Sequence, residues 1–239
     1  MCKALLEGET CVPLRERNEA PTVDDDMKLF TYYRSSAAYR VRIALNVKGV
    51  PYELVSTHLR RGEHRDTAFL EMNPQGLVPA LVDDTTVISQ SIAIIEYLEE
   101  RYCDPPLLPR GRVDRARVRS MALAVACDMH PLNNLRVLNF LGGALGCDKD
   151  VVNTTWYRHW ISQGFQALER EAQRWTGDGR HLFGSEVTLA DVCILPQWYN
   201  ATRFGCDLAP YPTLRAICSH LETLSSFANA APEVQPDAE

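Results

Sequence analysis

Residues 35–53 have the sequence SSAAYRVRIALNVKGVPYE. Ser35 and Ser36 can cap the N-terminus of a helix, because a serine hydroxyl satisfies a backbone N–H that has no partner in the first turn. Apolar residues then follow at the i, i+3, i+4 spacing of one helical face: Val41, Ala44 and Leu45. Gly49 is a typical residue just beyond a helix C-terminus. The stretch therefore predicts a helix that begins at the serines and ends before Gly49.

The flanking residues predict strands on both sides of this helix. Residues 29–33 and 52–58 are rich in β-branched and aromatic residues, and a helix that joins two such strands forms a βαβ unit. Residues 80–82 and 86–88 flank a turn and predict a hairpin. A helical stripe follows the hairpin: Ile94, Ile95, Leu98 and Tyr102. The order βαβ and then ββα predicts a small domain with a single-layer sheet.

A proline-rich segment, DPPLLP at residues 104–109, separates this unit from the rest of the chain. Proline cannot continue a helix, so we expect a semi-rigid linker here. The residues beyond it have helical periodicity, and the main helical segments expected are 112–138, 151–175, 189–203 and 213–227. Pro131 is expected either to kink or to divide the first of them. The sequence thus predicts four parts: a flexible extension at 1–26, an α/β domain at 27–104, a linker at 105–110 and an all-helical domain at 111–239.

The composition is typical of globular proteins. Hydrophobic residues make up 46% of the 239 residues and charged residues 23%, which excludes a wholly disordered or fibrous chain. No apolar run approaches the roughly 20 residues that a membrane span needs. The formal net charge of -6 argues against nucleic acid or an acidic membrane as a partner. Any anion site must therefore be a local cluster of basic residues.

The eight cysteines form no Cys-x-x-Cys pair and no cluster with histidine. The sequence therefore predicts neither a metal site nor a dithiol redox motif, and free buried thiols are expected. Residues 1–26 contain no apolar segment of the secretory type and are rich in acidic residues. These features favour a protein of the reducing cytoplasm.

Three short motifs together predict a groove for a small peptide-like ligand that carries a carboxylate. Ser35 lies at a strand–helix junction, where unpaired N–H groups favour an anion, although a plain N-cap is the alternative. Val78-Pro79 precedes a strand, and a cis peptide bond there would expose backbone groups to an extended ligand. Gln90-Ser91 begins the next helix and offers a second anion-binding helix start.

These and other motifs resemble the zeta class of glutathione S-transferases. The similar stretches are residues 35–53, NPQGLVPAL, ISQSIAIIEYLEERY, DMHPLNNLRVL, the TLAD box and NATRFGCDLAPYP. The resemblance extends from about Met27 to the C-terminus. It implies a glutathione S-transferase fold, with a thioredoxin-like N-terminal domain and an all-helical C-terminal domain. It also implies glutathione as cofactor and assembly as a homodimer.

The resemblance also implies roles for individual residues. Ser35 or Ser36 would activate the thiolate, with Ser35 preferred. The other residues expected at the glutathione site are His64, Val78, Pro79, Gln90, Ser91, His130 and Asn134. One position departs from the pattern, because Ala37 stands where many zeta members have cysteine. The nucleophile would then be the sulfur of glutathione itself.

The activity that the resemblance implies is glutathione-dependent cis–trans isomerisation of maleylacetoacetate to fumarylacetoacetate, a step of tyrosine and phenylalanine catabolism. Its substrate is a dicarboxylate, and a guanidinium matches a carboxylate with two hydrogen bonds. Arg34, Arg136 and Arg203 are therefore the expected substrate-binding residues, with Arg34 also expected to be catalytic. The alternatives are the same reaction on maleylpyruvate, a broad glutathione transferase, and a non-catalytic module that retains the fold.

Overall fold

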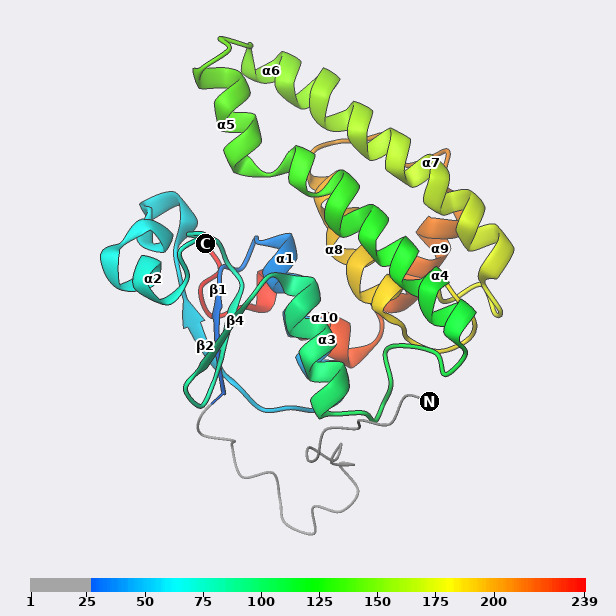
Figure 1. Cartoon of the computed structure of the whole chain (residues 1–239). Coiled ribbons are helices and arrows are strands. Elements are labelled where there is room, and N and C mark those ends of the chain that lie inside the picture. The colour runs from blue at the N-terminus through cyan, green and yellow to red at the C-terminus, as the bar shows by residue number, and fades with distance from the viewer. Residues whose placement is uncertain (1–26) are drawn as a thin grey trace, which may run out of the picture.

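The computed structural model describes residues 27–239, and the predicted extension at 1–26 lies outside the described residues. Strands and helices alternate in the first part of the chain, and helices make up the second part (Figure 1). The first part contains β1 (Met27–Thr31), α1 (Ser36–Lys48), β2 (Glu53–Ser56), α2 (Thr67–Met72), β3 (Ala80–Asp83), β4 (Thr86–Ser89) and α3 (Ser91–Arg101). The second part contains α4 (Arg112–Leu123), α5 (Leu135–Gly143), α6 (Lys149–Val151), α7 (Arg158–Trp175), α8 (Leu189–Arg203), α9 (Pro212–Leu221) and α10 (Ser225–Ala228).

The strands form one sheet in the order β2-β1-β3-β4. Within it β1 pairs in parallel with β2 and antiparallel with β3, and β3 and β4 form the expected hairpin. A parallel pair needs a crossover connection, which α1 provides. This topology confirms the predicted βαβ and ββα units and the thioredoxin-like fold. The strand predicted at 29–33 is shifted, because the chain leaves the sheet after Thr31 to form the loop before α1.

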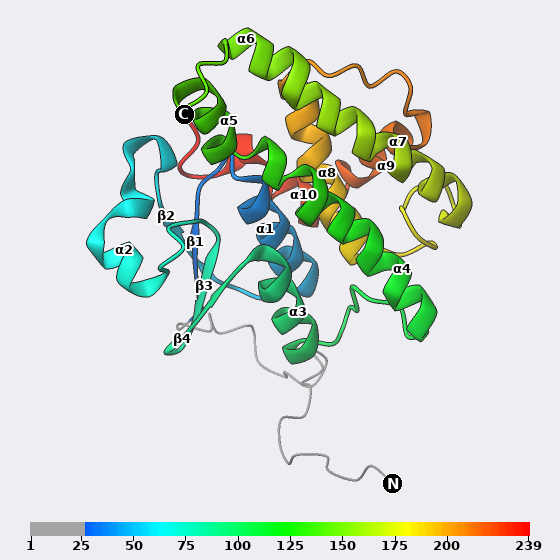
Figure 2. The same cartoon turned by 45° about the horizontal axis from the view of Figure 1, so that its top comes forward.

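Helix α1 is buried between the sheet and the helical part of the chain (Figure 2). Its N-cap is Ser35, whose Oγ accepts a hydrogen bond from the backbone N–H of Ala38 at 3.2 Å. Gly49 ends the helix with a φ of 62°, a left-handed conformation that glycine adopts without strain. The predicted helix is therefore confirmed at both ends. Because α1 packs against α3, α8 and α10, its start is fixed relative to both parts of the chain.

The side chain of Arg42 connects the loop before α1 to the end of the chain. It is fully buried, and its guanidinium donates to the carbonyl oxygens of Tyr33 and Ala230 and to the hydroxyl of Thr31, each at 3.0 Å. Burial lowers the pKa of Arg42 to about 10, so this arginine is still charged at neutral pH. The loop that leads to Ser35 is thus held from the inside of the molecule.

The helical segment predicted over residues 112–138 is divided near Pro131, as expected. Helix α4 ends at Leu123 and continues as a π-helical segment, Ala124–Met129, and a single 3-10 turn follows at Pro131–Asn133. Proline has no backbone N–H to continue the helical hydrogen bonds, so the chain breaks there. Asn134 caps the next helix, since its Oδ1 accepts from the N–H of Arg136 at 3.1 Å.

Two of the other predicted helices are also modified, whereas one is confirmed. The helix predicted at 151–175 contains a π-helical segment, Val152–Tyr157, before α7, and the one predicted at 213–227 is divided into α9 and α10. The helix predicted at 189–203 has the expected bounds. Its start is specified by the capping box of Thr188 and Asp191, which the structure contains.

The cysteines are less buried than expected. Cys193 and Cys218 are buried free thiols, but Cys127 is exposed, and Cys147 and Cys206 are half-buried. The prediction of free buried thiols is wrong for these three, which are accessible to solvent, and for Cys103, which is exposed and disulfide-bonded. Among the described helices, none is both long and apolar enough to cross a bilayer.

We expect Arg42→Met to lower the free energy of unfolding by roughly 3 kcal/mol, because buried acceptors left without donors cost about 1–3 kcal/mol each. The matched control is Arg170→Met on α7, where the arginine is exposed. This control should change the free energy of unfolding by less than about 0.5 kcal/mol. Urea titration of both variants measures the difference, and equal losses would contradict the role of Arg42.

Candidate active site

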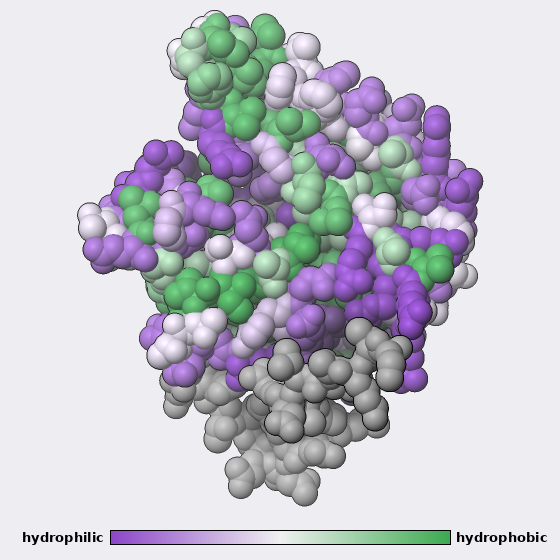
Figure 3. Space-filling view, viewed as in Figure 1, coloured by the Kyte–Doolittle hydropathy of each residue, from purple (hydrophilic) through white to green (hydrophobic). Residues whose placement is uncertain are grey.

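A cleft of about 760 Å³ lies where the two parts of the chain meet. The first part contributes residues of the segments 32–36, 59–65 and 75–78, and the helical part contributes residues of 130–139 and 200–204. Figure 3 shows a recess with hydrophilic residues around it, between the lobe that carries α2 and helix α5. A smaller cavity of about 200 Å³ adjoins the cleft, because Val78, His130 and other residues line both.

The structure brings all of the sequence-predicted site residues to these two cavities. The residues that line the cleft are Arg34, Ser35, Ser36, His64, Val78, His130, Asn134, Arg136 and Arg203. The remaining three, Pro79, Gln90 and Ser91, line the smaller cavity. Residues from four loops and two helical segments that are far apart in the sequence therefore meet in one place.

Ser35 is held at the junction of the β1–α1 loop and α1. Its backbone N–H donates to the carbonyl oxygen of Tyr32 at 2.9 Å, and its Oγ accepts the capping bond from Ala38. A hydroxyl has one donor and two acceptor sites, so capping leaves the O–H free to donate into the cleft. The two interpretations of Ser35, helix cap and anion donor, are thus compatible.

Ser36 is placed differently, although it is the next residue. Only 4% of its surface is exposed, and its Oγ accepts a hydrogen bond from the side-chain amide of Asn200 on α8. The Oδ1 of Asn200 in turn accepts from Nη1 of Arg203 at 3.3 Å. Ser36 is therefore engaged in a contact between the two parts of the chain, and half-buried Ser35 is the more accessible of the two hydroxyls.

The backbone at the two other predicted motifs has special conformations. The Val78-Pro79 peptide bond is cis, as expected. Gln90 has a φ of 72°, which is rare and strained for a residue with a side chain, and strain of this kind clusters at binding sites. Its Nε2 donates to Oε1 of Gln75 at 2.7 Å, which fixes the side chain at the margin of the smaller cavity.

The two predicted histidines are neutral at physiological pH. Burial, with the nearby charges of Arg40 and Arg136, lowers the pKa of His130 to about 3. Partial burial, with the charge of Arg65, also lowers the pKa of His64. Neutral imidazole can donate and accept hydrogen bonds without adding charge. The Nδ1 of His64 has no partner among the described residues, so it is available to a polar ligand of the cleft.

The cleft is strongly basic, although the chain is acidic overall. Among the described residues that line it, none is aspartate or glutamate. The arginines that line it are Arg34, Arg60, Arg61, Arg65, Arg136 and Arg203. Like charges on one concave surface attract and concentrate an anion of opposite sign, and a dianion more than a monoanion. The basic cluster expected from the composition is therefore present.

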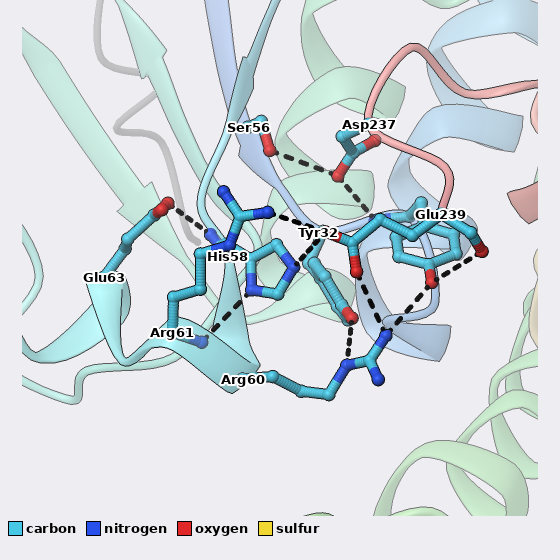
Figure 4. Close-up of polar contacts among 9 residues, drawn as sticks. Tyr32, Ser56, His58, Arg60, Arg61, Glu63, Asp237 and Glu239 are labelled. Carbon is cyan, nitrogen blue, oxygen red and sulfur yellow. Dashed lines mark hydrogen bonds and ion pairs between the residues drawn. The ribbon is translucent and has the colours of Figure 1, made fainter.

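Two of these arginines are organised by the last residues of the chain (Figure 4). The carboxylate of Glu239 pairs with Arg60 at 3.2 Å, with Arg61 at 2.8 Å and with His58 at 3.1 Å. Arg60 also donates from Nε to the hydroxyl of Tyr32 at 3.2 Å. The ion pairs of Arg60 and Arg61 are exposed and contribute little stability, but they orient the segment that carries the two arginines.

Comparison with known proteins gives the family. Residues 29–106 match the model of the glutathione S-transferase N-terminal domain. A probable maleylacetoacetate isomerase of Vibrio cholerae is 48% identical over 88% of this chain and 97% of its own length. A solved holo structure of maleylpyruvate isomerase, described as a bacterial zeta-class glutathione S-transferase, is 47% identical over 89% of this chain and all of its own, with a TM-score of 0.86.

The chain belongs to the zeta class of the glutathione S-transferase family. A further solved structure of the class is a maleylacetoacetate isomerase of Methylobacterium extorquens AM1, which contains bound malonate and glutathione. It is 41% identical over 89% of this chain and 99% of its own length, with a TM-score of 0.84.

Several residues of this glutathione S-transferase site were not predicted from the sequence. Arg60 and Arg61 belong to a run of basic residues, LRRGEHR at 59–65, whose charge density could have indicated them. Asn200 gives no local signal, since its role depends on contact with Ser36 across the domain boundary. Arg40 is a charged residue within the apolar part of α1, and such a position indicates either a buried ion pair or a ligand.

We expect His130 to remain neutral in NMR titration from pH 8 to pH 5, whereas free histidine takes up a proton near pH 6.5. The reason is the pKa of about 3 that burial and two arginines impose. The unfolded chain binds this proton at about pH 6.5, so acidification from there toward pH 3 should also destabilise the fold. An inflection of the His130 ring signals above pH 5 would contradict this environment.

Proposed function

We propose that this glutathione S-transferase is a glutathione-dependent cis–trans isomerase that converts maleylacetoacetate to fumarylacetoacetate. The observation that carries the proposal is the cleft beside Ser35, where four of the six lining arginines form no ion pair with a described carboxylate and none of the described lining residues is acidic. Such a site favours a dicarboxylate next to an ionised thiol. The names of the relatives, and the malonate and glutathione bound together in one of them, support the same pair of ligands.

Glutathione fits the residues that the two cavities contain. Val78 lines both cavities, where its backbone can pair with an extended peptide, and His64 has an unpaired buried ring nitrogen. The smaller cavity adds Gln90 and Ser91 at the N-terminus of α3, where a carboxylate is favoured. In this assignment His130 and Asn134 contact the cofactor from the helical part.

When bound, glutathione supplies a thiolate that adds reversibly to the cis double bond, which becomes a single bond that can rotate. At a pKa near 8.5 only about 3% of a thiol is ionised at pH 7. To lower the pKa of the thiol by two units, the site must stabilise the thiolate relative to the thiol by roughly 2.7 kcal/mol. A hydrogen bond from the Ser35 hydroxyl to a charged sulfur contributes roughly 1.5–3 kcal/mol, and the N-terminus of α1 about 0.3–1 kcal/mol.

Arg34, Arg136 and Arg203 are assigned to the two carboxylates of the substrate and to the negative charge that develops on its carbonyl oxygen. Fixed cations are effective here because they need no reorganisation during the reaction. Arg34 lies directly before Ser35, and Arg203 is oriented by Asn200. Ala37 lines the smaller cavity and has no nucleophilic group, which agrees with a mechanism whose nucleophile is the cofactor.

Maleylpyruvate is the second candidate substrate. The solved maleylpyruvate isomerase is 47% identical to this chain, close to the 48% of the maleylacetoacetate isomerase relative. Both substrates are cis-unsaturated dicarboxylates, so the arginines alone do not separate them. A broad transferase or a non-catalytic module has less support, because all the predicted ligand-contacting residues meet at the cleft.

The proposal includes a homodimer in the cytoplasm. The assembly is supported by the family resemblance, and a monomeric mass in solution would contradict it. The compartment is supported by the five free thiols among the described cysteines, whereas Cys103 is disulfide-bonded. Recovery of the protein from an extracellular fraction would contradict that assignment.

The proposal is tested by following the loss of the cis isomer with maleylacetoacetate and maleylpyruvate side by side. We expect turnover of at least one substrate that requires glutathione and that S-methylglutathione inhibits, because this analogue fits the site but has no thiol. The faster substrate identifies the better assignment. Turnover without glutathione, or no turnover of either substrate by protein that binds glutathione, would contradict the proposed function.

A further inference from the structure

Arg40, on α1, is a buried cation whose hydrogen-bonding capacity is largely unused. Only 1% of its surface is exposed, and it lines the smaller cavity together with Gln90 and Ser91. Its Nη1 donates to Oγ of Ser91 at 3.4 Å. Its Nε and Nη2 are buried and have no partner among the described residues.

The other buried cations of the same helix are satisfied. The guanidinium of Arg42 donates to three carbonyl oxygens and a hydroxyl, and Lys48 forms an ion pair with Glu99. Arg40 forms no ion pair with a carboxylate of the described residues. A buried charge without a partner is costly, so this arrangement favours an anion in the cavity that Arg40 lines.

The contact with Ser91 fixes what that serine can do. A guanidinium has donors but no acceptor, so Oγ of Ser91 must accept from it, and the hydroxyl proton of Ser91 must be donated elsewhere. Ser91 is also the first residue of α3, an eleven-residue helix whose unpaired N–H groups favour an anion at this end. The Ser91 hydroxyl, polarised by Arg40, therefore has a proton available to an anion in the cavity.

We infer that Arg40 is a positioning residue of the glutathione site, which acts through Ser91 to select the α-carboxylate of the γ-glutamyl residue. This inference rests on the proposed function, since it takes glutathione as the ligand. The placement of the arginines supports it: Arg34 and Arg203 line only the large cleft and Arg136 lines both cavities, whereas Arg40 lines only the smaller cavity beside Gln90. Arg40 is thus the arginine that serves the smaller cavity alone.

The test compares the binding of two thiol ligands by calorimetry. One is glutathione, and the other is γ-aminobutyryl-cysteinylglycine, which is glutathione without the α-carboxylate of its glutamyl residue. Arg40→Met should weaken glutathione binding roughly 10- to 100-fold and change the binding of the analogue less than about twofold. Arg40→Lys keeps the charge but not the planar fork, so its loss should be intermediate. Binding of malonate should be unchanged in both variants.

A merely structural role for Arg40 would weaken both thiol ligands equally, and this result would overturn the inference. A selective loss of malonate affinity would also overturn the inference, because the smaller cavity would then bind the substrate rather than glutathione. If Arg40→Met does not fold, the inference is tested by comparing glutathione binding by Ser91→Ala with that by the double variant Ser91→Ala, Arg40→Lys. Because Arg40 acts through Ser91, the double variant should bind glutathione no more weakly than Ser91→Ala alone, and additive losses would contradict the relay.

These outcomes are separate from a failure of the proposed function. Wild-type protein that binds neither thiol ligand contradicts the assignment of glutathione itself. Wild-type protein that binds both equally well contradicts the carboxylate subsite, and with it the role of Arg40, but leaves the isomerase proposal standing.

Discussion

The buried guanidinium of Arg42 fixes the loop from which the site is built. It holds the carbonyl oxygens of Tyr32 and Tyr33 and that of Ala230, and so joins the end of β1 to the end of the chain. The loop cannot form regular strand hydrogen bonds, because the chain must turn from the sheet into α1 within a few residues. An internal cation satisfies its carbonyl groups instead, and Ser35 is thereby held at the start of α1 with its hydroxyl toward the cleft.

A second set of polar contacts holds the two parts of the chain together around that loop. Lys48 donates to the carbonyl oxygens of Tyr102 and Pro105, and its partner Glu99 accepts from the backbone of Leu107. The linker is therefore attached to both α1 and α3. On the opposite side, Asn200 joins α8 to Ser36. Ser35, which we propose activates the thiol, and the arginines of the helical part are consequently held in one arrangement, although they belong to different parts of the chain.

The sequence predicts those features that depend on local chemistry. The bounds of α8 were predictable because a capping box specifies its start, and the ends of α1 because a serine and a glycine have known preferences at helix termini. The site residues could be predicted because they belong to short motifs, and the structure places them at the two cavities. Features that depend on long-range contact were not predictable. The π-helical segments, the bridge from Asn200 to Ser36 and the pairing of Glu239 with Arg60 and Arg61 arise only when distant elements pack.

The account requires that the Ser35 hydroxyl stabilise an ionised sulfur, and the pKa of the bound thiol measures this. Ultraviolet absorbance of the thiolate, titrated against pH in the complex with glutathione, gives that pKa. The account predicts a midpoint roughly two units below the value of about 8.5 for a free thiol, and a return toward that value in Ser35→Ala. A wild-type midpoint equal to that of the free thiol, or a midpoint that Ser35→Ala leaves unchanged, would contradict it.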